Sequence, residues 1–131
     1  KAIVEGISYN IRWIIENYEK DFRFLIKSLK ILGGASQSDE WMQILADVTH
    51  RTIFTLNHPR MGGSLGAAMC AYVGGNVYPS FEAIRKIVKI KKKYTPNPTN
   101  FPIYDKLFKD YQNIYFDLKR SYKKANQYRF T

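Results

Sequence analysis

Apolar side chains that recur at intervals of three and four residues predict three amphipathic helices. The first helix is expected from Ala2 to Glu19, and the second carries its apolar face on residues 41–48. The third runs from Phe101 to about Gln127 and should be about 40 Å long, at about 1.5 Å per residue. The chain is therefore expected to be rich in helix.

Two short segments between these helices have the composition of buried strands. Leu25–Leu32 alternates between apolar and polar residues in its second half and runs into Gly33-Gly34. Arg51–Leu56 is β-branched and aromatic and is followed by Asn57-His58-Pro59. Because a helix separates the two strands, they are expected to run parallel, joined by a crossover connection. The predicted fold class is α/β, with a small parallel sheet and a long C-terminal helix.

The segment between the second strand and the last helix is rich in glycine and proline. Gly62–Tyr72 is expected to begin as a glycine turn and to continue as a helix, which Gly74-Gly75 ends. Another helix is expected from Phe81 to about Ile90, with Ser80 as its N-cap. Residues 94–100 contain two prolines and are expected to form an extended connection.

The composition is that of one globular domain, since 45% of the 131 residues are apolar and 24% are charged. The longest apolar stretch, Leu65–Val73, is too short to cross a membrane. The single cysteine, Cys70, cannot form an internal disulfide, which favours the reducing cytosol as the location. The chain opens at Lys1 inside an apolar helical pattern and without a methionine. Residues 1–131 are therefore expected to be one domain cut from a longer polypeptide.

The net charge of +10 is concentrated in the C-terminal part of the chain. Residues 80–131 hold 13 basic and 4 acidic side chains, against 8 and 7 in residues 1–79. Such a field attracts phosphate-bearing partners, including nucleic acid, anionic lipid and nucleotides. One interpretation is a non-catalytic module that binds nucleic acid or an acidic partner through Arg85–Lys93 and Lys119–Lys124. The other is a solvated basic face.

The glycine turn Gly33-Gly34-Ala35-Ser36 follows a predicted strand and leads into a predicted helix, for which Ser36 or Ser38 is the candidate N-cap. Free backbone N–H groups in this setting can bind an anion or a nucleotide. The spacing matches neither the dinucleotide fingerprint nor the phosphate loop of P-loop enzymes, so a purely structural turn stays an alternative. The second turn, Gly62–Gly66, has the same two interpretations.

The other singled-out residues are interpreted as structural. His50 and His58 have no cysteine or carboxylate at ligand spacing, so no metal site is expected. Cys70 is expected to be a packed small side chain, and Trp41 a core or interface aromatic. Asp47 is expected to cap local backbone groups rather than to face a ligand.

Four motifs in order resemble the C-terminal domain of the FGGY carbohydrate kinases, in the form found in xylulokinases. Gly33–Val48 is similar to the family's GGGA-x-S-x-x-W-x-Q-x-x-A-D-V stretch, and Ala2–Ile7 to the helix before it. Gly63–Ala68 resembles the family's G-[AS]-x-G-A-A helix start. The fourth motif has two parts, Tyr94–Pro98 and Tyr104–Leu107, which resemble the elements that lead into the closing helix. The motifs are distributed from Ala2 to Leu107, along most of the chain.

This resemblance implies the second lobe of an actin-like, ribonuclease H-like ATPase fold, whose two lobes close over ATP and a sugar. The family transfers the γ-phosphoryl group of ATP to a sugar hydroxyl with Mg²⁺; here the sugar would be D-xylulose or a related one. By this match Gly33 and Gly34 approach the phosphate and ribose side of the nucleotide, and Ser38 lies near the ribose or base. Ala35 replaces a frequent third glycine, and Met61 replaces a frequent acidic residue.

The family's phosphate loop and catalytic aspartate have no counterpart here, since none of the six aspartates precedes a glycine. The resemblance therefore implies no catalytic residue and no metal ligand in this chain, which alone should be inactive. The sugar would be held mainly by the N-terminal lobe. Neither a membrane nor nucleic acid is implied as a partner, and the oligomeric state stays open, with a homodimer among the alternatives.

Overall fold

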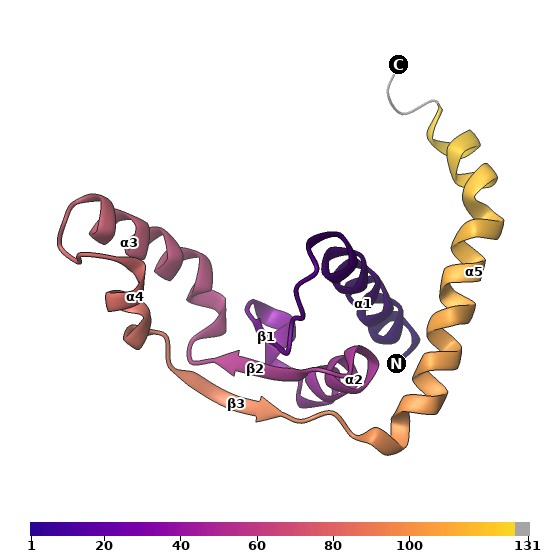
Figure 1. The fold of residues 1–131 in the computed structure, drawn as a ribbon, viewed down its shortest axis with the longest axis horizontal. Coiled ribbons are helices and arrows are strands. Elements are labelled where there is room, and N and C mark those ends of the chain that lie inside the picture. The colour runs from indigo at the N-terminus through magenta and orange to yellow at the C-terminus, as the bar shows by residue number, and fades with distance from the viewer. Residues whose placement is uncertain (128–131) are drawn as a thin grey trace.

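The computed structural model describes residues 1–127, apart from the side chain of Arg85. Helices dominate, and a small sheet lies between them (Figure 1). The α-helices are α1 (Ala2–Phe22), α2 (Asp39–Thr49), α3 (Gly62–Gly74), α4 (Phe81–Ile84) and α5 (Phe101–Asn126). The strands are β1 (Ser28–Ile31), β2 (Thr52–Leu56) and β3 (Ile90–Tyr94). Short 3-10 turns are η1 (Gly34–Gln37), η2 (Pro59–Met61), η3 (Arg85–Ile87) and η4 (Pro98–Asn100).

The three predicted amphipathic helices are confirmed. The first extends three residues past Glu19 and ends at Arg23, whose left-handed backbone (φ 51°) closes the helix. Helix α2 starts at the predicted N-cap, where the Ser38 hydroxyl accepts a hydrogen bond from Trp41 N, and ends at His50 (φ 56°). The long closing helix begins at Phe101, as the proline-rich connection predicts.

The sheet has the order β1-β2-β3 and is mixed. The predicted parallel pairing of the first two strands is confirmed, with Ser28 opposite Thr52 and Ile31 opposite Thr55. The expectation of an all-parallel sheet is wrong, because β3 pairs antiparallel to β2, with Phe54 opposite Lys93.

The predicted helix from Phe81 to Ile90 is wrong beyond Ile84, because the residues that follow turn and become β3. In that strand Tyr94 is buried and donates its hydroxyl to Asp39 Oδ1 at 2.6 Å. Lys92 Nζ lies 2.5 Å from Asp39 Oδ2. These contacts to α2 offset the weak strand preference of a lysine run.

The first predicted strand is shorter than expected, since residues 25–27 precede β1 without joining the ladder. Side chains bind the backbone of the middle residue instead: Ile26 N donates to Glu19 Oε1, and Ile26 O accepts from Arg51 Nε. Side-chain partners thus satisfy this backbone outside the sheet.

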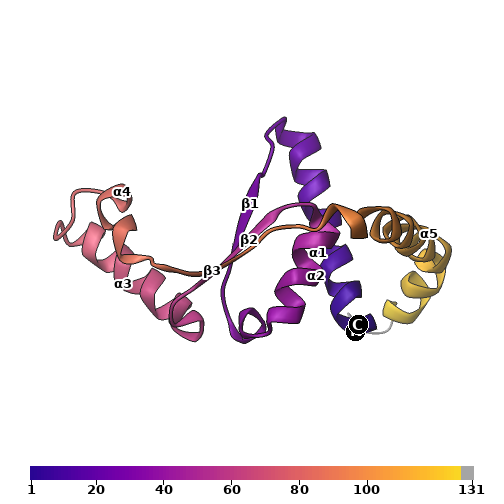
Figure 2. The ribbon, with the colours of Figure 1, turned by 90° about the horizontal axis from the view of Figure 1, so that it is seen from below.

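Helix α2 packs on one face of the sheet, and α1 and α5 pack against α2 (Figures 1 and 2). Two groups of buried side chains form the core. The first joins α2 to the sheet and comprises Met42, Leu45, Ala46, Ile53 and Tyr94. The second joins α1, α2 and α5 and comprises Tyr9, Val48, Tyr104 and Phe108. Fully burying one such large side chain stabilises the fold by roughly 1.5–3 kcal/mol.

Asp47 has the structural role that its sequence context predicts. Its carboxylate is buried and accepts three hydrogen bonds, from Asn97 N at 2.8 Å, Asn100 Nδ2 at 2.7 Å and Gln43 Nε2 at 2.8 Å. Two of these donors lie in the connection between β3 and α5. Asp47 therefore attaches this connection to α2 and fixes where the last helix starts.

Helices α3 and α4 form an arm on one side of the sheet, apart from α1, α2 and α5 (Figure 1). No residue of α3 is buried, because only α4 and η2 contact it extensively within the described part of the chain. The expectation that Cys70 packs in an interior is therefore wrong, and its thiol is exposed.

Candidate functional site

The candidate site lies at the carboxyl edge of the parallel strands β1 and β2. Both strands end at the same edge, and open α/β sheets commonly bind ligands there. The two loops that follow the strands contact each other: Gly33 N donates to Pro59 O at 3.0 Å, and Arg60 Nη2 donates to Gln37 Oε1 at 3.3 Å. The fold thus brings the first glycine turn next to residues 59 and 60, which come shortly before the second glycine segment.

The first glycine turn has a backbone conformation that requires its glycine. Gly33 has φ 89°, a backbone angle that residues with a Cβ rarely adopt. Ser36 holds the turn closed, because its hydroxyl donates to Gly33 O at 2.7 Å and its N–H donates to the same oxygen at 3.3 Å. Ser36 is buried, and sequence reasoning missed this role, although a serine three residues after a turn glycine could have suggested it.

The space beside this turn is open to a ligand. A Cβ built on Gly33 or on Gly34 would meet no protein atom within 4 Å. The first backbone N–H groups of a helical turn have no partner inside it, so those at the start of η1 can face an anion. The turn can therefore accept the close approach of a phosphate or a ribose.

The predicted site residue Ser38 lies at the end of this turn and serves as the N-cap of α2. Its Oγ accepts from Trp41 N at 3.2 Å and donates to Glu40 Oε2 at 3.0 Å. The hydroxyl is thus engaged in the helix start.

The second glycine segment differs from the expected turn, because Gly62, Gly63 and Gly66 all lie within α3. A Cβ on Gly62 would lie 2.9 Å from Leu32 Cδ1, so this glycine permits close packing of the helix start against the end of β1. A Cβ on Gly63 or Gly66 would meet nothing within 4 Å. Gly33 in the first segment is thus required by its backbone conformation, whereas Gly62 in the second segment is required by close packing.

Asp39 connects the candidate site to the basic run on β3. Hydrogen bonds from Lys92 and Tyr94 hold the pKa of Asp39 below its ordinary value, and the same contact raises the pKa of Lys92. Lys92 is therefore paired with α2. Part of the basic run that the sequence suggested as a binding patch is strand β3, which stabilises the sheet.

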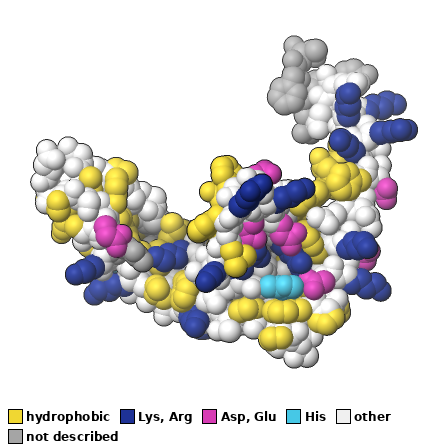
Figure 3. All heavy atoms as spheres, in the orientation of Figure 1, with side chains coloured by type: hydrophobic (Ala, Val, Ile, Leu, Met, Phe, Trp, Pro, Cys, Tyr) yellow, Lys and Arg dark blue, Asp and Glu magenta, His cyan; other side chains and the backbone are white. Residues whose placement is uncertain are grey.

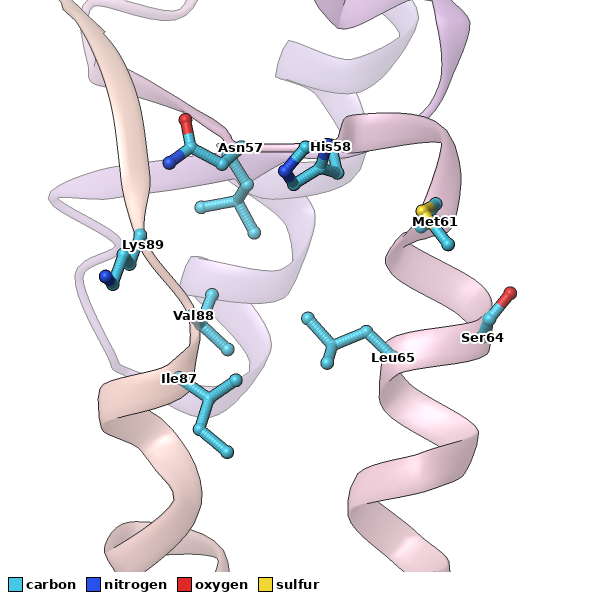
Figure 4. A pocket seen from close by; sticks show the side chains of 9 residues that line it. Asn57, His58, Met61, Ser64, Leu65, Ile87, Val88 and Lys89 are labelled. Atoms are coloured by element: carbon cyan, nitrogen blue, oxygen red, sulfur yellow. The ribbon is translucent and has the colours of Figure 1, made fainter.

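A pocket of about 560 Å³ lies beyond the end of β2, between α3 and residues 87–89 (Figure 4). Leu65 points from α3 toward Ile87 and Val88, so the middle of the pocket is apolar (Figure 4). His58 lines the pocket at the end of β2, in a left-handed conformation (φ 53°). Within residues 1–127 no group of three or more His, Cys, Asp or Glu side chains could hold a metal ion.

A second pocket, of about 470 Å³, is lined by charged side chains that already pair with one another. Arg12 bonds Glu16 at 2.7 Å and Asp105 at 2.6 Å, and Arg51 bonds Glu19. These pairs link α1 to α5 and to the loop after α2. We interpret this cluster as structural.

His50 caps α2 beside this cluster. Its ring stacks on Phe101 with the ring centroids 3.8 Å apart, and its Nε2 lies 3.1 Å from Asp105 Oδ1. Burial lowers the pKa of His50 below its ordinary value, and the nearby Asp105 carboxylate offsets part of this effect. His50 thus has the structural position predicted for it.

The chain belongs to the FGGY family of carbohydrate kinases, of which the C-terminal domain matches residues 1–75. Its fold is that of the C-terminal lobe of these ribonuclease H-like kinases. The described helices include none with the length and apolar character needed to cross a membrane.

Individual relatives carry different substrate names. The chain is 32% identical over 116 residues to a xylulose kinase of Staphylococcus xylosus, covering 88% of this chain and 24% of the relative. It is 38% identical over 91 residues to an autoinducer-2 kinase of Salmonella paratyphi A, covering 69% and 17%. A gluconate kinase structure from Lactobacillus acidophilus superposes with a TM-score of 0.78 at 27% identity, covering 95% and 25%. The chain thus spans a quarter or less of the length of these relatives.

Proposed function

We propose that residues 1–131 form the nucleotide-binding C-terminal lobe of an ATP-dependent sugar kinase. The kinase would transfer the γ-phosphoryl group of ATP to a sugar hydroxyl. The observation that supports this best is the turn at Gly33-Gly34, which lies at the carboxyl edge of parallel strands with open space beside both glycines. Phosphoryl transfer depends mainly on positioning and charge neutralisation, so a backbone approach to the nucleotide is a sufficient role for this lobe.

Three residues are proposed to contact the nucleotide. Gly33 and Gly34 would lie against its phosphate and ribose side, where a side chain would block access. Ser38 would lie near the ribose or the base. Its hydroxyl also caps α2, so it would act mainly by holding the backbone of the segment in place. The methyl group of Ala35 would narrow the site beside the glycines.

The catalytic base and most sugar-binding groups are proposed to belong to an N-terminal lobe of a longer polypeptide. Relatives act on xylulose, autoinducer-2 and gluconate, so similarity supports the sugar kinase class more strongly than any one sugar. D-xylulose or a related sugar is the substrate that we propose. Residues 1–131 by themselves should not phosphorylate it.

The described residues fit the nucleotide better than they fit Mg²⁺. The open glycine turn can receive ATP, whereas no cluster of metal-ligating side chains occurs in residues 1–127. Mg²⁺ would therefore enter with the phosphates of ATP and be held by groups other than these residues. A basic module that binds nucleic acid or an acidic partner is the alternative, and the pairing of Lys92 with Asp39 weakens it.

The test is ADP binding to the complete polypeptide, measured by isothermal titration calorimetry. Gly34→Asp places a carboxylate against the phosphates, and we expect at least about tenfold weaker binding, equivalent to about 1.4 kcal/mol. Gly6→Asp is the matched control, because Gly6 on α1 also has open space beside it and lies outside the site. Equal affinity of Gly34→Asp and wild type would refute the assignment of the turn.

A further inference from the structure

The C-terminal half of α5, residues 113–126, stands apart from the other elements (Figure 1). The first half of this helix buries Tyr104 and Phe108 in the core, whereas every residue from 113 to 126 is exposed. Near the middle of the helix the ring of Phe116 contacts Trp13 on α1. The end of the helix therefore presents a surface that the rest of the described chain does not cover.

One side of this half-helix carries a stripe of large apolar side chains. Ile114, Leu118 and Tyr122 follow one another at intervals of four residues, which places them on the same side of a helix over about 12 Å. They are 55%, 41% and 49% exposed, respectively. Apolar side chains with this helical periodicity are normally buried against another surface. The stripe therefore points to an occupant that accepts apolar side chains.

The same half-helix carries a cluster of cations. Residues 113–126 include one acidic side chain, Asp117, and four basic ones, which are Lys119, Arg120, Lys123 and Lys124. At about 3.6 residues per turn, Lys119 and Lys124 lie about 100° and about 120° from the apolar stripe, on its two sides. Within residues 1–127, none of the four basic side chains forms an ion pair with an acidic one. Figure 3 shows apolar and basic side chains gathered on the outer part of α5, so the occupant must also accept positive charge.

An anionic phospholipid bilayer accepts both kinds of side chain at once. Its acyl boundary takes up the apolar face of an amphipathic helix, and its phosphates attract Lys and Arg, whose stems can extend along the helix. A protein surface that covered the stripe would bring the flanking cations out of water, and the described residues supply no acidic partner to offset that cost. Nucleic acid would bind the cations through its phosphates but would leave Ile114 and Leu118 in contact with water. Of these three occupants, the bilayer surface fits the half-helix best.

We propose that residues 113–126 of α5 bind the surface of an anionic phospholipid bilayer. The helix lies in the interface, with the apolar stripe toward the acyl chains and with Lys119 and Lys124 at the lipid phosphates. It does not cross the bilayer, because four basic side chains within 14 residues oppose insertion. The family resemblance implies no membrane partner, so this binding is a property of the end of this chain's own α5.

Bilayer binding should leave the candidate nucleotide site accessible. Helix α5 packs on α2 through Val48, near the end of α2, whereas the glycine turn leads into the start of α2 at Ser38. Residues 113–126 lie beyond that contact, at the far end of α5. We therefore expect bilayer binding and ADP binding to be independent of each other, and the inference does not rest on the proposed function.

The test is co-sedimentation of the complete polypeptide with vesicles of equal parts phosphatidylserine and phosphatidylcholine, compared with vesicles of phosphatidylcholine alone. Each cation near an anionic surface strengthens binding roughly fivefold, so Lys123→Gln/Lys124→Gln should weaken binding to the anionic vesicles by about 25-fold. Both lysines are exposed, so the melting temperature of this double variant should not change. Lys89→Gln/Lys91→Gln is the matched control, because it removes the same charge from exposed lysines outside α5, and it should weaken binding by less than about twofold. Equal losses in the two double variants would overturn the proposal.

A second variant tests the apolar stripe. Leu118→Ser should weaken binding to the anionic vesicles by at least about fivefold, because a large apolar side chain no longer enters the acyl boundary. Asn113→Ser is the matched control, because Asn113 is exposed on the opposite side of the same half-helix, and this variant should bind like wild type. Unchanged binding of Leu118→Ser would show that charge alone attracts the helix and would overturn the proposed arrangement.

Three results with the wild-type polypeptide would also overturn the proposal. Absence of sedimentation would show that another part of the polypeptide covers α5. Equal binding to both kinds of vesicle would show adsorption without recognition of lipid charge, and tighter binding to a DNA duplex than to the anionic vesicles would show nucleic acid as the occupant. The assay contains no nucleotide, so its result is separate from that of the ADP titration.

Discussion

Replacing Asp47 by alanine should strongly destabilise the protein, because one buried carboxylate holds α2 to the start of α5. Its two oxygens accept hydrogen bonds from Asn97 N, Asn100 Nδ2 and Gln43 Nε2, at 2.7–2.8 Å. Asp47 is 3% exposed, so water cannot take the place of its carboxylate unless the surrounding residues move.

The expected loss follows from these bonds. A hydrogen bond to a charged group contributes roughly 1.5–3 kcal/mol, and removing one member of a buried network leaves donors unsatisfied. Asn97 is exposed and can turn its N–H to water, so the three contributions should not add in full. We expect Asp47→Ala to lower the free energy of unfolding by about 2–4 kcal/mol. Asp47→Asn keeps one acceptor oxygen and should cost about half as much.

Urea unfolding followed by circular dichroism measures this loss. Asp110→Ala is the matched control, because it removes an exposed carboxylate from α5, and it should change stability by less than about 0.5 kcal/mol. A loss below about 1 kcal/mol in Asp47→Ala would refute the reasoning. It would show that the connection between β3 and α5 is held in place by other contacts.

Three further predictions concern helix ends and titrating groups. Arg23→Gly should stabilise the protein by about 0.5–1 kcal/mol in thermal unfolding, because it relieves the left-handed conformation at the end of α1. Burial lowers the pKa of His50, so the unfolded state binds this proton more tightly, and the stability of the fold should decrease as the pH drops through 6.5. Asp105→Asn should lower the pKa of His50 further in an NMR titration. An unchanged pKa would contradict the contact between His50 and Asp105. Burial acts to raise the pKa of Glu19, but hydrogen bonds from Arg51 and from a backbone N–H outweigh burial, so the pKa of Glu19 is lowered. The stability that this carboxylate contributes should be present above pH 4.5 and lost below it. Glu19→Gln should reduce this acid sensitivity in urea unfolding.

The sequence was sufficient for the parts of the fold in which local pattern and tertiary packing agree. Part of the apolar stripe on each of α1, α2 and α5 packs in the core, although Ile3, Ile14 and Ile114 are exposed. Ser38 caps α2 as predicted. It was insufficient for β3, because three consecutive lysines carry no strand signal. Their strand conformation depends on Asp39 and on pairing with β2, which lie far away in the sequence.

The candidate site shows the same division. The chain order of strand, glycines and helix was enough to locate the turn at Gly33. It was not enough to distinguish a glycine required by its positive φ, Gly33, from a glycine required by close packing, Gly62. The buried role of Ser36 and the exposure of Cys70 depend on which elements cover them, and a single sequence does not specify this. Conformation and coverage are tertiary properties, whereas capping and periodicity are local.

The most direct test of the central claim is phosphoryl transfer by the complete polypeptide. The assay follows label from γ-³²P-ATP to D-xylulose and to a panel of other ketoses and sugar acids. We expect labelled sugar phosphate from wild type, and for Gly34→Asp a KM for ATP raised at least about tenfold with the KM for the sugar unchanged. No transfer to any sugar, or an unchanged KM for ATP in the variant, would contradict the proposal that this lobe binds the nucleotide of a sugar kinase.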